Sequence, residues 1–159
     1  MSSLSSLIVG SYDDWTKSLP GYQLRVLDEL VSSGVPEDDL AQQWLSATYD
    51  STTLPFGAGP GRSEYIERFW DEVHDLLCAE SKYVDERAEL TKSLGVGQAS
   101  AVACVSAFLA HVLPVSAAAV APPVAIVFFT IAKMGLNAWC RVQTQRRSER
   151  NSQPPVDAA

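Results

Sequence analysis

The chain has 159 residues, a net charge of −7 at pH 7 and an ordinary apolar content of 47%. This length suffices for one domain with a proper core, and the negative charge argues against broad nucleic-acid binding, which needs a basic face. The charge is unevenly distributed: residues 1–92 hold 17 acidic and 7 basic side chains, residues 93–132 hold no Asp, Glu, Lys or Arg, and residues 133–159 hold 5 basic and 2 acidic ones. We therefore expect an acidic front part, an apolar middle part and a basic end.

The three cysteines, Cys78, Cys104 and Cys140, are far apart and form no CxxC pair. An odd number of widely spaced cysteines is typical of free, buried thiols in a reducing compartment. The first basic residue is Lys17, so the N-terminus lacks the basic start of a secretory signal. Both features favour a cytoplasmic location.

Residues 1–20 begin with a Ser-rich stretch, and we expect them to be loosely ordered. Apolar residues at helical spacing then predict helices over 22–33, 36–48 and 63–92, which together form an acidic module at 21–92. In the last helix the apolar stripe weakens near Glu80 and Ser81, which marks a point where the helix can break. The first two helices have the spacing of a helix-turn-helix, but the carboxylates at the start of the second would face DNA phosphates, so we expect no nucleic-acid partner.

Residues 50–61 form a loop rich in Gly and Pro that precedes a helix. Backbone N–H groups in such a loop can cradle an anion, but the loop lacks the Gly-Lys-Ser/Thr signature and no strand precedes it. We therefore interpret it as a connector. Farther along, Asp71, His74 and Cys78 share a helix face and are candidate zinc ligands. No second cluster completes a tetrahedral site, so we expect no metal.

Residues 93–148 are predicted to form an apolar, Ala-rich helical hairpin. Pro114 and the pair Pro122–Pro123 interrupt the uncharged run, and proline ends or kinks helices. The simplest interpretation is one helix over 98–113 and an antiparallel second helix from about 124 to 148. Residues 149–159 are expected to be disordered. The fold is thus predicted to be all-α, with a bundle-like front module followed by the hairpin.

Small residues recur at every fourth position of the first hairpin helix, at Ala99, Ala103 and Ala107. Such a row lets two helix backbones approach closely, especially in membranes, so we expect it to pack against the second helix. The alternative is that alanine is a common helix former, and any Ala-rich helix has such rows.

Polar groups are a second feature of the hairpin. Thr130, Lys133 and Asn137 lie on one face of the second helix, and His111 lies in the first. In a membrane we expect these four residues to line a polar seam between hairpins, whereas in a soluble protein they should face water.

The position of Lys133 decides whether the second helix can span a bilayer. A helix that starts at Val124 places Lys133 near its middle, where insertion costs roughly 2.5–3.5 kcal/mol. A helix that starts at Val115 moves Lys133 to the end, where it can snorkel, but then encloses the proline pair. Neither version is a clean spanning helix.

No residue pattern predicts catalysis. Cys104 and His111 share a face of the first hairpin helix, but about two turns, some 10 Å, separate them, and activation of a thiol needs hydrogen-bond contact. The acidic pairs match no recognisable motif. We therefore expect a protein that is not an enzyme and needs no cofactor.

Two functions fit this layout. In the first, a small helical protein inserts or anchors its hairpin in a membrane as a membrane-active effector, with lipid as its partner and both termini on the cytoplasmic side. This layout resembles, in outline, pore-forming toxins that hide an apolar hairpin inside a soluble helical shell. In the second, a soluble cytoplasmic scaffold or adaptor buries the hairpin in a homo-oligomer or against a protein partner.

Overall fold

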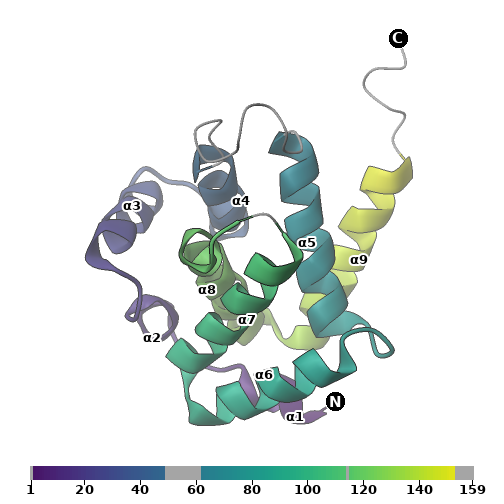
Figure 1. The fold of residues 1–159 in the computed structure, drawn as a ribbon. Helices are drawn as coiled ribbons and strands as arrows, with labels where there is room; N and C mark the ends of the chain where they lie inside the picture. Colours follow the sequence, from purple (N-terminus) through teal and green to yellow (C-terminus); the bar gives the residue numbers. More distant parts are fainter. Residues whose placement is uncertain (1, 49–61, 114, 153–159) are drawn as a thin grey trace.

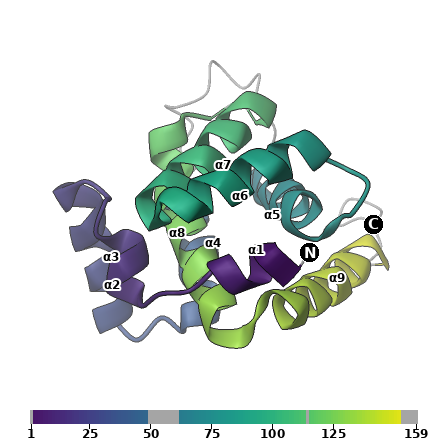
Figure 2. The ribbon, with the colours of Figure 1, turned by 90° about the horizontal axis from the view of Figure 1, so that it is seen from below.

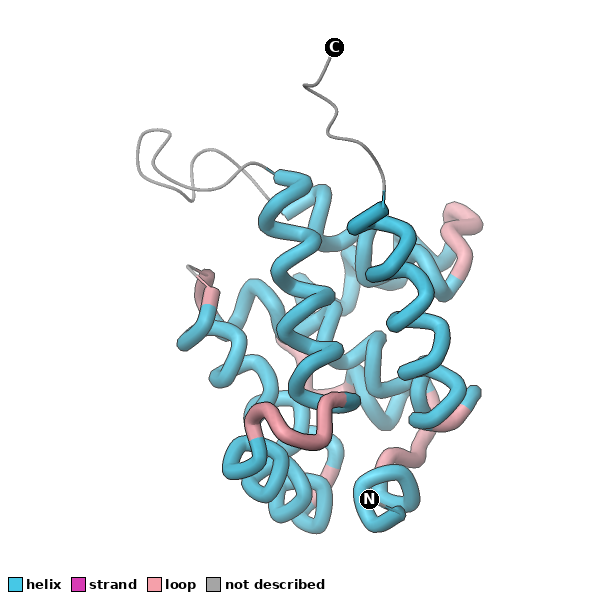
Figure 3. The backbone as a smooth tube through the Cα atoms, turned by 90° about the vertical axis from the view of Figure 1, so that its right-hand side faces the viewer, coloured by secondary structure: helices cyan, strands magenta, loops and turns pink. Residues whose placement is uncertain are grey.

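The structure, a computed structural model, describes residues 2–48, 62–113 and 115–152. These residues form nine helices and no strand, so the predicted all-α fold is confirmed (Figure 3). The helices are α1 Ser2–Leu7, α2 Tyr12–Thr16, α3 Gly21–Ser32, α4 Glu37–Thr48, α5 Arg62–Cys78, α6 Val84–Val96, α7 Gln98–Val112, α8 Ala117–Met134 and α9 Leu136–Ser152.

Helix α8 is the centre of the fold (Figure 1). It packs against α7, α4, α2 and α9, and residues 122–128 are buried without interruption. Seven consecutive residues cover nearly two turns, so neighbours surround every face of the helix there. Around this axis α5 lies beside α9, and α6 runs alongside α7 with α1 against it (Figure 2).

The second hairpin helix differs from the prediction at both ends. Instead of one helix over 124–148, the chain forms α8 and α9, which Gly135 separates with a φ of 90° that favours glycine. At the other end α8 starts at Ala117, where Ser116 caps it by accepting a hydrogen bond from the Ala119 N–H at 3.2 Å. Pro122 and Pro123 therefore lie inside the helix rather than before it.

The predicted helix over 63–92 is two helices, α5 and α6, and they separate at residues 79–83, where the apolar stripe weakens. Buried Arg87 organises this turn. Its guanidinium donates to the carbonyl oxygens of Leu76 at 3.0 Å and Lys82 at 2.8 Å, and also to that of Ala79. These bonds satisfy a carbonyl in the last turn of α5, which lacks a helical donor, and two carbonyls in the turn that follows it.

The N-terminal segment is more ordered than expected. Within residues 2–20 the chain forms α1 and α2, and Trp15 is 1% exposed because it stacks on Phe128 of α8 with ring centroids 4.7 Å apart. Tyr12 meets Phe129 edge-on in the same interface. These aromatic contacts explain why a Ser-rich start still folds onto the core.

The acidic module and the hairpin share one hydrophobic core, which extends from Leu4 to Trp139. Helix α9 continues to Ser152, into the segment expected to be disordered. The predicted loop at 50–61 and the rest of the tail, 153–159, lie outside the described residues.

Candidate functional site: the enclosed helix α8 and its two fastenings

The proline pair leaves two carbonyl groups of α8 without their helical donors. In an α-helix the N–H of residue i bonds to the carbonyl of residue i−4, and proline has no N–H. The carbonyls of Ala118 and Ala119 therefore receive nothing from Pro122 and Pro123. Ala118 is exposed and Ala119 is half-buried, and a carbonyl that is shielded from water without a partner costs about 1–3 kcal/mol.

Two side chains from the front part of the chain donate hydrogen bonds to these carbonyls in place of the missing backbone N–H groups. Gln23 on α3 donates from Nε2 to the Ala118 oxygen at 2.8 Å, and Trp44 on α4 donates from Nε1 to the Ala119 oxygen at 3.0 Å. Both donors are buried, with 3% and 4% of their surface exposed. We call these two hydrogen bonds the latch. The latch explains why α8 continues through two prolines that local rules predict to break it.

The second fastening joins α5 to α9 on the other side of α8 and contains a disulfide. Cys78 and Cys140 are bonded, with their Cα atoms 5.8 Å apart, while Cys104 is free and half-buried. The expectation of three free thiols is therefore wrong. The odd number of cysteines gave no indication of this bond. The two bonded cysteines are 62 residues apart in sequence, and only the packing of α5 on α9 brings them together.

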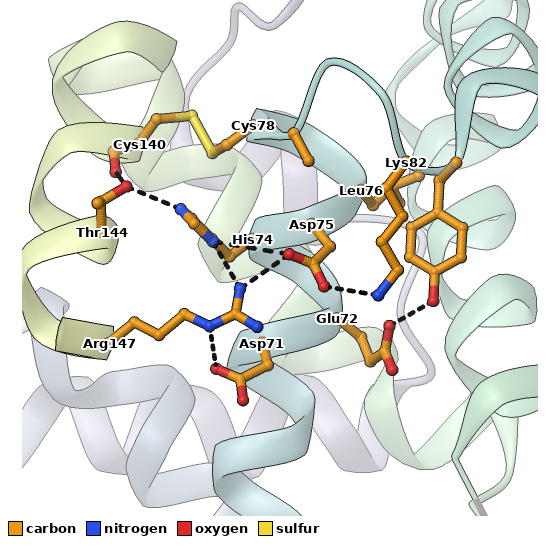
Figure 4. A network of polar contacts seen from close by, with 12 residues as sticks. Asp71, Glu72, His74, Asp75, Leu76, Cys78, Lys82, Cys140, Thr144 and Arg147 are labelled. Carbon is orange, nitrogen blue, oxygen red and sulfur yellow. Dashed lines mark hydrogen bonds and ion pairs between the residues drawn. A yellow bond between two sulfur atoms is a disulfide. The ribbon is translucent and has the colours of Figure 1, made fainter. Parts of the chain in front are cut away.

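Ion pairs extend this fastening along the same two helices (Figure 4). Asp71 accepts from Arg150 Nη2 at 2.7 Å and from Arg147 Nε at 3.3 Å. Asp75 accepts from Arg147 Nη1 at 2.8 Å and from Lys82 Nζ at 3.0 Å. We call the disulfide and these ion pairs together the clamp.

His74 lies within the clamp as a neutral ring. Its Nδ1 is 3.1 Å from Arg147 Nη1, and because arginine can only donate, Nδ1 accepts and the proton lies on Nε2, which donates to Thr144 Oγ1 at 2.9 Å. Burial, followed by the neighbouring Arg147 charge, lowers the pKa of His74 below its ordinary value. Burial raises the pKa of Asp75, but hydrogen bonds from Arg147 and Lys82 outweigh it and lower that pKa.

The candidate zinc ligands are thus engaged elsewhere. Asp71 and His74 belong to the clamp, and Cys78 forms the disulfide. In the described ranges no group of three or more His, Cys, Asp or Glu side chains is arranged to hold a metal ion.

The row of small residues lies on the outer side of α7. Ala99, Ala103 and Ala107 are exposed. A different face of α7 is buried, and it contains Ala101, Val102, Val105, Ser106 and Leu109. The hairpin thus packs through larger apolar side chains, and the i, i+4 spacing of the alanines identified a helix face but not which way that face points.

The four polar seam residues do not meet in this structure. His111 is exposed near the end of α7 where the chain turns back, whereas Thr130, Lys133 and Asn137 lie toward the far end of α8 and the start of α9. Thr130 is half-buried and donates to the Ile126 carbonyl at 2.9 Å. Lys133 and Asn137 are exposed, and the Lys133 ammonium lies 5.4 Å from the centre of the Phe129 ring.

Comparison with protein-family models, with curated proteins and with solved structures found no match. The geometry of α8 and its two fastenings is therefore the basis for a functional assignment.

Proposed function

We propose that this is a non-enzymatic helical protein that keeps an apolar helical hairpin, α7–α8, enclosed in a soluble fold and delivers it to a membrane. The observation that supports this most is the composition and length of α8. Among the described helices it alone is long and apolar enough to cross a bilayer. Its 18 residues span about 27 Å at a rise of about 1.5 Å each, close to the roughly 30 Å of a hydrocarbon core.

The observed start of α8 supports insertion further. Because the helix begins at Ala117, Lys133 is its penultimate residue rather than its middle one. A lysine at a helix end can extend its ammonium to the interface, which avoids most of the cost of a charge at the bilayer centre. The exposed side chain of Lys133 is consistent with this arrangement.

The two hydrogen bonds of the latch stabilise the soluble state, in which α8 is enclosed. In lipid the Ala118 and Ala119 carbonyls would lose Gln23 and Trp44, and hydrocarbon offers no replacement donor. The latch bonds therefore favour the enclosed state specifically. Insertion in this proposal begins when α3 and α4 separate from the first turns of α8.

In this proposal α7, an apolar helix of 15 residues that is shorter than α8, enters the bilayer together with α8, and the membrane thins locally to accommodate it. Both ends of the hairpin then stay on one side of the membrane, as expected from the sequence. The disulfide bears on which side this is. Disulfides form and persist in oxidising compartments, so the Cys78–Cys140 bond favours such a compartment over the cytoplasmic location that free thiols suggested.

The second candidate function is a soluble scaffold or adaptor. The uninterrupted burial of residues 122–128 favours it, since a core helix of a soluble protein has the same property. In that case α8 never leaves the fold, and protein partners bind the outer helices.

Liposome flotation with an alkaline carbonate wash distinguishes the two functions. We expect the full-length protein to stay with the vesicles after the wash, and Lys133→Leu to increase the retained fraction. Lys92→Leu is the matched control, because Lys92 is an exposed lysine of α6 whose partner is Glu89 at 3.6 Å. Full release of the wild type, together with equal behaviour of the two variants, would refute membrane insertion and leave the scaffold function.

A further inference from the structure

A cleft of about 240 Å³ lies between α4, α5, α8 and α9. Its apolar lining includes Trp70, Trp139, Ile126 and Met134. The cleft lies along the second half of α8, away from the latch at its start. At about 30 Å³ for a water-sized group, the space holds roughly eight such groups. A space of this size accommodates a short to medium apolar chain.

Besides Thr130, two polar side chains border this apolar cleft. Gln143 lines it, is only 7% exposed, and makes no hydrogen bond to another described residue. Its amide is not among the fully enclosed polar groups that lack a partner, so it is accessible from the cleft. Arg146 also lines the cleft but is exposed, and it forms no ion pair with any residue in the described ranges. An amide donor and a guanidinium thus border the same apolar space.

The charge around the cleft favours an anion. Its described lining contains Arg146 as its one charged group and no carboxylate. On the adjoining helix α5, the carboxylates of Asp71 and Asp75 are paired with the clamp arginines Arg147 and Arg150. Arg146 therefore remains available for an incoming carboxylate, although the protein as a whole is acidic.

We propose that this cleft binds a medium-chain fatty acid in the folded, soluble protein. Its carboxylate accepts hydrogen bonds from the Arg146 guanidinium and the Gln143 amide, and its tail lies between Trp70 and Trp139 over the apolar side of α8. Pockets for small ligands have this composition, with apolar walls and a few polar groups that fix the orientation. The site is independent of membrane insertion, since it belongs to the enclosed state of α8.

Tryptophan quenching by 10-bromodecanoate tests this proposal on the full-length protein, below the concentration at which the acid aggregates. Bromine quenches tryptophan on contact, and two of the four tryptophans line the cleft. We expect saturable quenching. We expect Arg146→Gln to weaken the affinity about tenfold, as for the loss of a charge-assisted hydrogen bond. The matched control is Arg141→Gln, an exposed arginine of the same helix outside the lining, which should bind as the wild type does.

Two competing ligands with the same tail separate the role of charge from apolar partition. Decanoate should displace the brominated acid, while decanol should displace it weakly and decyltrimethylammonium should not displace it. Quenching that rises linearly without saturation, displacement by the cation as strong as by the acid, or equal affinities of the two arginine variants would overturn the proposal. Each of these results leaves the flotation experiment unaffected, so the two proposals fail separately.

Discussion

Trp44→Phe is the most informative perturbation of the latch. The phenyl ring keeps an aromatic side chain in the core but removes the indole N–H that donates to the Ala119 carbonyl at 3.0 Å. Because Pro123 supplies no backbone donor in its place, the carbonyl of half-buried Ala119 is left without this bond. We expect a loss of about 1–3 kcal/mol in the free energy of unfolding, and a melting temperature lower by about 2–4 °C per kcal/mol for a chain of this size.

The smaller ring also costs packing energy, so a control must separate the two effects. Trp15 is a second buried tryptophan, 1% exposed, and its Nε1 has no hydrogen-bond partner among the described residues. Trp15→Phe therefore loses ring volume and stacking but no hydrogen bond. Urea unfolding followed by circular dichroism gives the free energy for each variant. We expect Trp44→Phe to be the more destabilising of the two.

A double-mutant cycle with Pro123→Ala tests the geometric explanation itself. Alanine returns a backbone N–H that can donate to the Ala119 carbonyl, so Trp44→Phe no longer leaves that oxygen without a partner. We expect the cost of Trp44→Phe to be smaller by about 1–2 kcal/mol in the Pro123→Ala background, which is a coupling of the size seen for side chains in contact. An equal cost in both backgrounds would refute the idea that the tryptophan replaces a donor lost to proline.

Four further predictions concern the rest of the fold. Replacing both Cys78 and Cys140 by serine opens a loop of 62 residues, which the chain-entropy relation values at about 4 kcal/mol, measurable by urea unfolding. The pKa of His74 is lower folded than its unfolded value of 6.5, so the unfolded chain binds more protons and stability should fall as pH drops from about 6.5 through the folded pKa; His74→Gln should remove that part of the pH dependence. Ala103→Leu should change stability by less than about 0.5 kcal/mol, since Ala103 is exposed. Native-state hydrogen exchange should open α3, which buries two of its residues, before α5 and α9.

The fold class and several helices could be predicted from periodicity alone. The predicted helix at 22–33 differs from α3 by one residue at each end, and the one at 36–48 differs from α4 by one residue at its start. The first hairpin helix, predicted over 98–113, is α7. The apolar stripe also marked the separation of α5 from α6 near Glu80 and Ser81. These features depend on residues a few positions apart, which is the range over which sequence patterns are informative.

The helix through the proline pair could not be predicted in this way. Local rules end or kink a helix at Pro122 and Pro123 because two hydrogen bonds are lost. The replacement donors are Gln23, 95 residues from its acceptor, and Trp44, 75 residues from its acceptor. Neither residue carries a local signal of this role. From the sequence pattern alone, without knowledge of the tertiary packing, Gln23 is expected to be an ordinary surface residue.

The disulfide was missed for a related reason. Cysteine spacing predicts a bond only in small disulfide-rich chains, and here the expectation of free thiols is wrong for Cys78 and Cys140 and right for Cys104. Cys78 and Cys140 lie within two stretches of opposite charge, and this could have suggested the pairing. The aspartates of α5 and the arginines of α9 attract each other. That signal becomes specific only after both helices are known to lie side by side.

The two fastenings of α8 differ in strength, and this difference determines which side of the fold can open. At its C-terminal end α8 leads within six residues to Cys140, which is bonded to Cys78 of α5. Farther along α9, Arg147 and Arg150 pair with Asp71 and Asp75 of α5. At its N-terminal end two neutral hydrogen bonds, each worth about 1 kcal/mol net, connect it to α3 and α4, and no disulfide among the described residues secures the front helices. Any departure of α8 from the core must therefore begin at Ala118 and Ala119, with α9 remaining in place. In the proposed insertion the hairpin leaves the core while the end of α8 stays held at the clamp, which fits the proposal that both of its ends lie on the same side of a bilayer.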